Sequence, residues 1–336
     1  MRQVSLAVLV LGAALGAATT SAGPGRGHSP EMLALEGDLT PIHDPAIVRH
    51  GDRYYVFATN RFAGKLLPTF CSADRCRWVL CGNVFDEVPA WALAEVPGAR
   101  GIWAPDVSYF RGRFHLYYSV STFGSNRSVI GLATNLTLDP THPDYRWVDE
   151  GRVVGSAPGD DWNAIDPNLA LDERGRPWLA WGSFWGGIKL HRVDPETGKL
   201  SARHRELVSL ASRRPLEPPA IEAPFIVRKD GHHYLFVSFD RCCRGRESTY
   251  KVVVGRAREI TGPYLDREGR PMLEGGGTLV IEGAEKWRGP GHPAVLLDAD
   301  ADLLVFHAYD ATTGRPSLHI STMAWEDGWP RAGRLR

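Results

Sequence analysis

Five ionisable side chains recur along the chain at intervals of 62, 60, 56 and 70 residues, each beside or near a proline that opens an apolar, aromatic-rich run. In chain order they are Asp44, Asp106, Asp166, Glu222 and His292. Carboxyl groups that converge from separate parts of a fold can act as general acid and general base on one bound substrate. The pattern therefore indicates acid–base hydrolysis, provided that the fold brings these segments together.

Glycoside hydrolysis needs such a pair of carboxyl groups, because one protonates the leaving oxygen while the other acts on the opposite face of the sugar. In inverting enzymes the two groups stand roughly 6.5–9.5 Å apart, which leaves room for a water molecule. Asp44 and Glu222, in the first and fourth copies of the repeat, are the natural pair. Asp166 would disfavour ionisation of a neighbouring carboxyl and could keep the acid protonated near neutral pH.

The repeat also predicts the elements that position these side chains. Each copy holds strand-like runs joined by Gly and Asp turns, as in RHGDRYYVFA from Arg49 and YFRGRFHLYYS from Tyr109, and no helical periodicity is visible. Repeats of this length and composition are typical of propeller blades, so five copies predict an all-β fold, a five-bladed β-propeller. Because the first strand of each blade lines the central channel, the five ionisable residues should meet at one mouth.

A simpler explanation of the repeat is that Asp before Pro only starts a strand from a turn. That explanation suits one or two copies. It accounts poorly for Glu222 in the fourth copy and His292 in the fifth, because neither residue type is a preferred turn former. We therefore favour a converging site over turn chemistry alone.

The first 22 residues predict a secretory signal peptide, with Arg2 ahead of an apolar stretch from Val4 to Ala18 and small residues up to Ala22. An uncleaved anchor is the alternative. Residues 23–34 predict a flexible tether, and residues 35–336 a single propeller catalytic domain. Lys plus Arg equals Asp plus Glu at 39 each, which favours neither nucleic acid nor an anionic membrane as partner. We expect a secreted (extracellular or periplasmic) monomer that has no membrane association after signal cleavage.

Five cysteines in an exported chain permit disulfides. Cys71, Cys76 and Cys81 are spaced five residues apart, and we expect a local bridge that joins Cys71 to Cys76 or Cys76 to Cys81. The adjacent Cys242 and Cys243 form either a vicinal disulfide or two separate thiols.

Seven motifs follow one another over about residues 38–325: HDP at Asp44, WAPD ending at Asp106, NAIDPN around Asp166, GSFWGGIKL from Gly182, EAP at Glu222, SFDRCCRGRESTY from Ser238 and WRGPGHPAV from Trp287. Together they resemble glycoside hydrolase family 43, and most closely its arabinan endo-1,5-α-L-arabinanases. The resemblance implies a five-bladed propeller and an inverting mechanism.

By motif, the resemblance implies that Asp44 is the general base, that Glu222 is the general acid, and that Asp166 raises the pKa of the acid and orients it. It also implies that His292 helps to bind one calcium ion, largely through water. Asp106 is expected to orient its neighbours rather than to react.

The resemblance further implies a sugar-binding rim. Trp103 and Phe123 match positions that form apolar walls around the arabinose. The other residues expected at the rim are Gly124, Asn163, Ala164, Ile165, Ser183, Phe184 and Trp185. Phe184 and Trp185 could instead pack between sheets, as blade aromatics commonly do.

The resemblance therefore implies an enzyme that cleaves internal α-1,5-L-arabinofuranosyl linkages of arabinan, a side chain of pectin, or of arabino-oligosaccharides. An exo-acting α-L-arabinofuranosidase or a β-xylosidase on the same fold is the nearest alternative, because loop shape decides between a cleft and a blind pocket. A retaining β-fructosidase would hold its acid in a Glu-Cys context, where this chain has Glu222-Ala223-Pro224. A lectin-like propeller would not need all three carboxylates.

Overall fold

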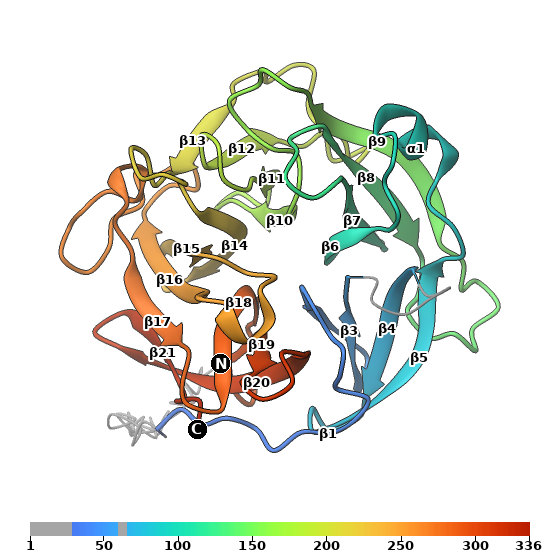
Figure 1. The fold of residues 1–336 in the computed structure, drawn as a ribbon. Helices are drawn as coiled ribbons and strands as arrows, with labels where there is room; N and C mark the ends of the chain where they lie inside the picture. The colour runs from blue at the N-terminus through green and yellow to red at the C-terminus, as the bar shows by residue number, and fades with distance from the viewer. Residues whose placement is uncertain (1–28, 60–65) are drawn as a thin grey trace, which may run out of the picture.

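The computed structural model describes residues 29–59 and 66–336, so the predicted signal peptide lies outside the described residues. Five sheets stand around a central axis (Figure 1). This arrangement confirms the predicted all-β five-bladed β-propeller. Within the two described ranges, no helix has the length and apolar character needed to cross a membrane.

Each blade is an antiparallel sheet whose strands follow in chain order from the axis outward (Figure 1). Blade 1 contains β2 (Ala46–His50), β3 (Arg53–Phe57), β4 (Leu66–Ser72) and β5 (Arg77–Phe85). Blade 2 contains β6 (Trp103–Phe110), β7 (Arg113–Val120), β8 (Ser128–Asn135) and β9 (Val148–Ser156). Blade 3 contains β10 (Asn168–Leu171), β11 (Pro177–Trp181), β12 (Ile188–Arg192) and β13 (Val208–Ala211). Blade 4 contains β14 (Ile221–Lys229), β15 (His232–Phe239), β16 (Lys251–Ala257) and β17 (Thr278–Glu282), and blade 5 contains β18 (Trp287–Leu296), β19 (Leu303–Asp310), β20 (Pro316–Glu326) and β21 (Trp329–Ala332).

The hydrophobic core is divided into five clusters, one at each joint between neighbouring blades. Alternate side chains of one strand serve two joints: Phe57 packs toward blade 2 with Leu116, whereas Val56 packs toward blade 5 with Val305. Strand β8 is buried along its whole length, because both of its faces meet a neighbouring blade. Each blade is therefore packed between its two neighbours.

Three short helical segments depart from the sequence expectation of no helix. They are α1 (Ala90–Glu95), between blades 1 and 2, and the 3₁₀ turns η1 (Gly245–Glu247) and η2 (Met272–Glu274). Six residues of α-helix and single 3₁₀ turns are too short for a 3.6-residue periodicity to appear in the sequence.

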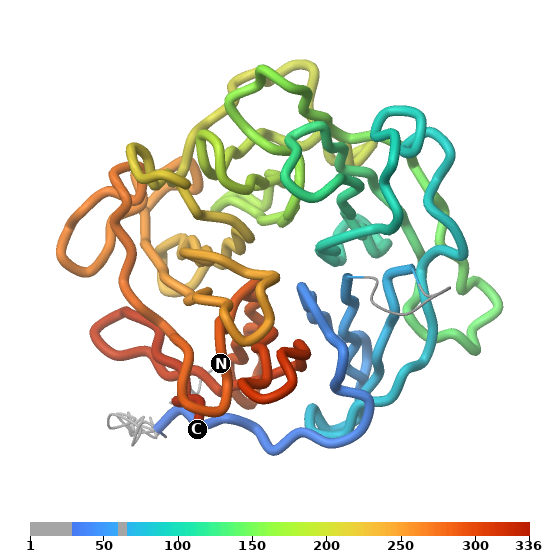
Figure 2. Tube along the Cα trace, in the orientation of Figure 1, coloured from blue at the N-terminus to red at the C-terminus, as the bar shows by residue number. Residues whose placement is uncertain are grey.

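The N-terminal segment joins the last blade to the first (Figure 2). Met32 forms a β-bridge with Ser321 of β20, and the Leu33 side chain packs into the core between blades 5 and 1. The following β1 (Glu36–Gly37) pairs in parallel with β5. The predicted tether is thus wrong for its described part, residues 29–34, because this part is pinned to blade 5 by backbone pairing and apolar contact.

The disulfides also correct the sequence expectation. Cys71 is bonded to Cys81, and Cys76 is the free thiol. Cys71 lies on β4 and Cys81 on the adjacent β5, with their Cα atoms 5.9 Å apart, whereas Cys76 lies in the turn that joins the two strands. The pairing of β4 with β5 therefore brings Cys71 next to Cys81 rather than to Cys76. Cys242 and Cys243 form the vicinal disulfide that the sequence had left open.

Candidate active site

A shared backbone conformation marks the start of the five inner strands. In each blade the residue before the motif proline has a left-handed φ of 43–57°, and these residues are Asp44, Ala104, Asp166, Ala223 and His292. Such a conformation costs about 1–3 kcal/mol for a non-glycine residue and persists where the surrounding structure imposes it. The true repeat is therefore aligned on its prolines, so Glu222 stands one residue before the shared position and Asp106 two residues after it.

The amide of each left-handed residue is held by a side chain of the preceding blade. The acceptors are His307 for Asp44, Thr59 for Ala104, Ser119 for Asp166, Asp166 for Ala223 and Ser238 for His292, with donor–acceptor distances of 2.8–3.2 Å. Four of them lie in or just after the second strand of their blade. The exception falls between blades 3 and 4. There the Asp166 carboxylate accepts the hydrogen bond from the Ala223 amide, and Ser183, which follows the second strand of blade 3, donates its hydrogen bond to Glu222.

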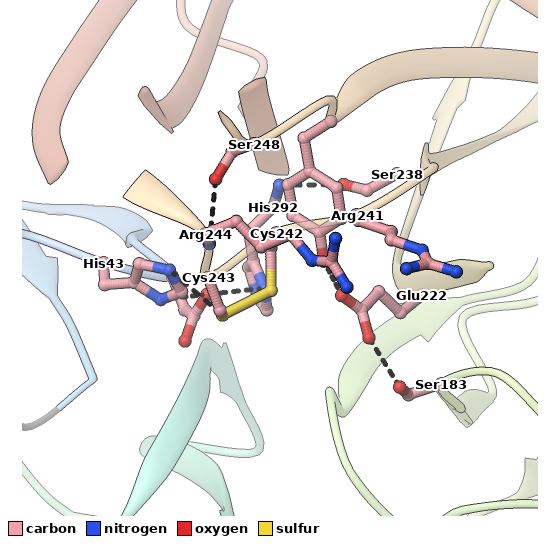
Figure 3. Close-up of a disulfide and its surroundings, with 12 residues drawn as sticks. His43, Ser183, Glu222, Ser238, Arg241, Cys242, Cys243, Arg244, Ser248 and His292 are labelled. Carbon is pink, nitrogen blue, oxygen red and sulfur yellow. Dashed lines mark hydrogen bonds and ion pairs between the residues drawn. A yellow bond between two sulfur atoms is a disulfide. The ribbon is translucent and has the colours of Figure 1, made fainter. Parts of the chain in front are cut away.

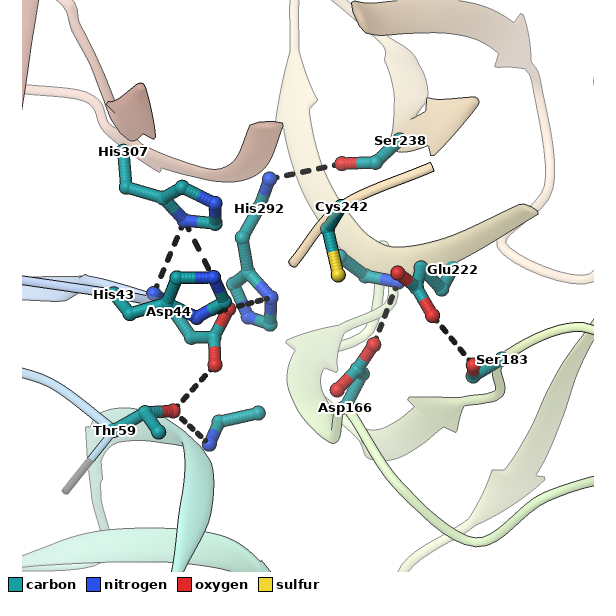
Figure 4. Close-up of polar contacts among 12 residues, drawn as sticks. His43, Asp44, Thr59, Asp166, Ser183, Glu222, Ser238, Cys242, His292 and His307 are labelled. Carbon is teal, nitrogen blue, oxygen red and sulfur yellow. Dashed lines mark hydrogen bonds and ion pairs between the residues drawn. The ribbon is translucent and has the colours of Figure 1, made fainter. Parts of the chain in front are cut away.

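Glu222 lies on β14, and its buried carboxyl group accepts two hydrogen bonds (Figure 4). Its Oε2 accepts a hydrogen bond from the Ser183 hydroxyl at 2.5 Å, and its Oε1 accepts one from the Tyr250 hydroxyl. Burial raises the pKa of Glu222, and the neighbouring Asp166 charge raises it further. The group is therefore suited to carry a proton at neutral pH.

Asp166 precedes β10 and faces Glu222 (Figure 4). Its Oδ2 accepts a hydrogen bond from the Ala223 amide at 3.1 Å, so Asp166 holds the backbone directly after Glu222. Burial raises the pKa of Asp166 and Asp44 adds to the rise, while His292 opposes it.

Asp44 lies across the channel, before β2, beside the rings of His43 and His292 (Figure 4). Its Oδ1 is 2.7 Å from His43 Nδ1 and 3.2 Å from His292 Nδ1, and its Oδ2 accepts the Thr59 hydroxyl. Burial alone would raise the pKa of Asp44, but His43 and His292 together hold it well below its usual range. Asp44 is therefore ionised under conditions in which Glu222 is protonated.

His292 stands between Asp44 on one side and Asp166 and Glu222 on the other (Figure 4). Burial would lower its pKa, but the charges of Asp44, Asp166 and Glu222 outweigh burial and raise it to about 9. Because Nδ1 faces Asp44, a cation would bind at Nε2 and displace the proton that this nitrogen carries in the imidazolium, as in carboxylate–histidine–metal arrangements. In the described part of the chain, the residue groups whose geometry suits a metal contain His43 and not His292, so a cation on His292 would take its other ligands from water.

The exposed part of the expected rim is aromatic. Phe123 is 82 % exposed, and Trp103 is half-buried on β6. Phe184 and Trp185 are also half-buried, and both have left-handed φ values, of 53° and 39°. Two successive bulky residues in this conformation are unusual and occur where the surrounding structure imposes them. Gly124 lies exposed beside Phe123.

Four other residues expected at the rim are buried. Asn163 accepts a hydrogen bond from Ser128 at 2.7 Å, so its carbonyl oxygen is already used within blade 2 and the turn that follows it. Ala164 and Ile165 are buried beside it, and Ser183 donates to Glu222. These four residues are therefore buried within the structure rather than exposed at a rim.

Asp106 is buried, and its carboxylate is hydrogen-bonded to blade 3 rather than to Asp166 or Glu222. Its two oxygens accept hydrogen bonds from Asn168 Nδ2 and from the Leu169 amide, each at 2.9 Å. Burial raises its pKa to about 6. The expectation that Asp106 orients its neighbours agrees with these bonds.

Five residues that contact the carboxyl groups, or support those that do, were not among the predicted site residues: His43, Thr59, Tyr250, His307 and Tyr309. Two of them had a signal in the sequence, because His43 opens the HDP motif and Tyr250 closes the SFDRCCRGRESTY motif. The other three come from second strands or their ends, where no motif marks a polar residue.

A carboxyl group suited to carry a proton and a carboxylate suited to stay ionised, from different blades and facing one channel, are the pair that glycoside hydrolysis requires. The sequence model of glycosyl hydrolases family 43 matches residues 40–330. The chain therefore belongs to glycoside hydrolase family 43 and is a glycosidase.

Relatives of known name support this membership. The chain is 42% identical over 311 residues to an extracellular exo-α-(1→5)-L-arabinofuranosidase of Cellvibrio japonicus, covering 89% of this chain and 88% of the relative. It is 43% identical over 291 residues to an extracellular endo-α-(1→5)-L-arabinanase of Bacillus subtilis, covering 86% and 87%. A solved Cellvibrio cellulosa α-L-arabinanase, complexed with arabinohexaose, superposes with a TM-score of 0.82 at 40% identity, covering 89% of this chain and all of that one.

Proposed function

We propose that the chain is an inverting arabinan hydrolase in which Asp44 is the general base and Glu222 the general acid. The observation that carries the proposal is the opposite electrostatic environment of the two groups. His43 and His292 lower the pKa of Asp44, whereas burial and Asp166 raise that of Glu222.

The reaction follows from these protonation states. Asp44 takes a proton from a water molecule as the water oxygen attacks the anomeric carbon. The glycosidic C–O bond breaks on the opposite face, and Glu222 gives its proton to the leaving oxygen. Asp166 holds the Ala223 amide and so fixes the orientation of the acid, while its charge keeps Glu222 protonated until the transition state.

The proposed substrate is α-1,5-linked L-arabinan, attacked at internal linkages. Relatives that the chain covers almost completely are named for α-(1→5)-L-arabinan, and one solved neighbour holds arabinohexaose. Exo-acting release of arabinofuranosyl units is the second candidate, because an exo-acting relative is as similar to the chain as an endo-acting one. The exposed Phe123 and the half-buried Trp103 are the aromatic faces proposed to contact the sugar.

The endo assignment is tested by following the viscosity of linear arabinan together with the release of reducing ends. Internal cleavage predicts a steep fall in viscosity while few reducing ends have formed. Arabinose release with little change in viscosity would refute the endo assignment and favour the exo candidate. Absence of any product from linear arabinan would refute the arabinan assignment itself.

We further propose that His292 Nε2 binds one calcium ion, with water completing its shell. The site fits a cation, because one imidazole stands among three carboxyl groups and its Nδ1 faces Asp44. When bound, the ion would add positive charge that keeps Asp44 ionised. The signal-like N-terminus and the extracellular relatives support secretion, and we propose a monomer, which size-exclusion chromatography with light scattering would test.

A further inference from the structure

The vicinal disulfide Cys242–Cys243 lies over the candidate active site, among His43, His292 and Glu222 (Figure 3). It sits in the loop of residues 240–249, which joins β15 to β16. Neither cysteine is fully buried. A bond between adjacent residues closes no long loop, so any stabilisation of the whole fold through chain entropy is small. Its effect must be local.

A short chain of contacts leads from this disulfide to the proposed general base. The Cys243 amide donates to the Tyr309 hydroxyl at 2.9 Å, and the Cys243 sulfur is 3.8 Å from His43 Nε2. The Tyr309 hydroxyl in turn contacts His43 Nε2 at 2.6 Å. The other ring nitrogen of His43 is 2.7 Å from Asp44 Oδ1. The disulfide therefore reaches the Asp44 carboxylate through His43, both directly and by way of Tyr309.

The same loop also reaches the proposed acid. Tyr250 follows the loop directly, and its hydroxyl donates to Glu222. Within the loop, Arg241 and Thr249 are joined by two hydrogen bonds, from the Arg241 amide to Thr249 Oγ1 and from the Thr249 amide to the Arg241 carbonyl. The base of the loop is thus fixed independently of the disulfide, which lies directly after Arg241.

The backbone of Cys242 and Cys243 is the part that the disulfide constrains. Cys243 has a left-handed φ of 64°, a conformation that few non-glycine residues hold without support. The covalent ring through both sulfur atoms limits the rotations that lie between the two α-carbons. When the ring opens, Cys243 can return to the common backbone regions, and its amide then turns away from Tyr309.

We propose that the Cys242–Cys243 disulfide is a positioning element for Asp44, acting through Tyr309 and His43, and that activity is therefore sensitive to reduction. This proposal rests on the proposed role of Asp44 as general base. A dithiol such as dithiothreitol supplies two electrons and two protons. The S–S bond breaks, each cysteine gains one hydrogen, and the dithiol closes to its own cyclic disulfide.

The test compares kcat and KM of the full-length secreted enzyme on arabino-oligosaccharides before and after reduction. Peptide mapping with alkylation shows which cysteines have been reduced. Opening of the vicinal disulfide should lower kcat roughly ten- to a hundredfold, because a displaced base loses alignment, while KM changes by less than about twofold. Reoxidation should restore kcat.

Three variants separate this role from others. Cys71→Ser/Cys81→Ser lacks the other disulfide and should respond to reduction like the wild type. Cys242→Ser/Cys243→Ser should start with a low kcat and not respond. If that double variant does not fold, Tyr309→Phe serves instead: it breaks the same contact chain, so its kcat should be low and reduction should lower it little further.

Several results would overturn the proposal: an unchanged kcat when both Cys242 and Cys243 are alkylated, a raised KM with unchanged kcat, or a loss that follows opening of Cys71–Cys81. The second result would make the disulfide a surface that contacts sugar. A wild-type enzyme with no activity on arabinan, even when oxidised, would refute the proposed function. An oxidised enzyme that is active but insensitive to reduction would refute only this inference.

Discussion

Replacing Asp166 with asparagine should shift the pH range in which the enzyme is active. The Asp166 carboxylate accepts the Ala223 amide and stands beside Glu222. Asparagine keeps an oxygen that can accept the same amide, so the backbone after the acid should stay in place. The substitution therefore removes the charge of Asp166 and largely preserves its shape.

The direction and size of the shift follow from what holds the proton on Glu222. Burial is the largest cause of its raised pKa, and the Asp166 charge is the second. Removing the charge leaves burial, so the pKa of Glu222 should fall by roughly one unit rather than return to its usual value. One unit corresponds to about 1.4 kcal/mol. The acid must be protonated to act, so activity is lost as pH rises through this pKa, and the loss should begin about one pH unit lower in Asp166→Asn.

The assay is the pH profile of kcat/KM on linear arabinan, whose alkaline limb reports the acid in the free enzyme. Asp106→Asn is the matched control: it also changes a buried inner carboxyl, but Asp106 is bonded to Asn168 and Leu169 rather than placed beside Glu222. The control should keep the alkaline limb of the wild type. An unmoved limb in Asp166→Asn, or an equal shift in the control, would refute the assigned role of Asp166.

Three further predictions concern other parts of the site. Asp44→Asn and Glu222→Gln should each reduce kcat on arabinan by about 10²–10⁴-fold. Glu222→Gln should retain more activity on a substrate with a good leaving group. Activity of either variant on arabinan within about tenfold of wild type would contradict the assignment. Exhaustive chelation should lower activity, and calcium should restore the wild type but not His292→Ala, whereas full activity after verified metal removal would make His292 purely structural. Asp106→Ala should lower the free energy of unfolding by about 2–4 kcal/mol in denaturant titrations, because two buried donors lose their acceptor; a loss below about 0.5 kcal/mol would contradict this.

The fold could be predicted because its repeat is carried by residues near one another in sequence. A proline, a polar neighbour and an alternating apolar run lie within one strand of each blade. The sequence alone did not give the exact register. Ala104 and Ala223 occupy the repeated left-handed position, and they carry no polar group that would mark it. Asp106 and Glu222 were therefore aligned with residues that are not their structural equivalents.

Contacts between strands and between blades could not be predicted, because they join residues that share no local pattern. The hydroxyl of Tyr309 reaches His43, and the ring of His307 reaches the Asp44 amide, only after blades 5 and 1 have packed. The Cys71–Cys81 disulfide depends on the pairing of β4 with β5, which spacing in the sequence does not reveal. Ser183 was expected to bind sugar and instead donates to Glu222.

The stereochemistry of hydrolysis tests most directly the claim that Asp44 activates water while Glu222 protonates the leaving oxygen. Proton NMR during the first moments of arabino-oligosaccharide cleavage identifies the anomer released before mutarotation mixes the two forms. Attack by water on the face opposite the leaving group predicts that the inverted β-anomer appears first. Early accumulation of the α-anomer would instead require a covalent intermediate and would contradict the proposed roles of both carboxyl groups.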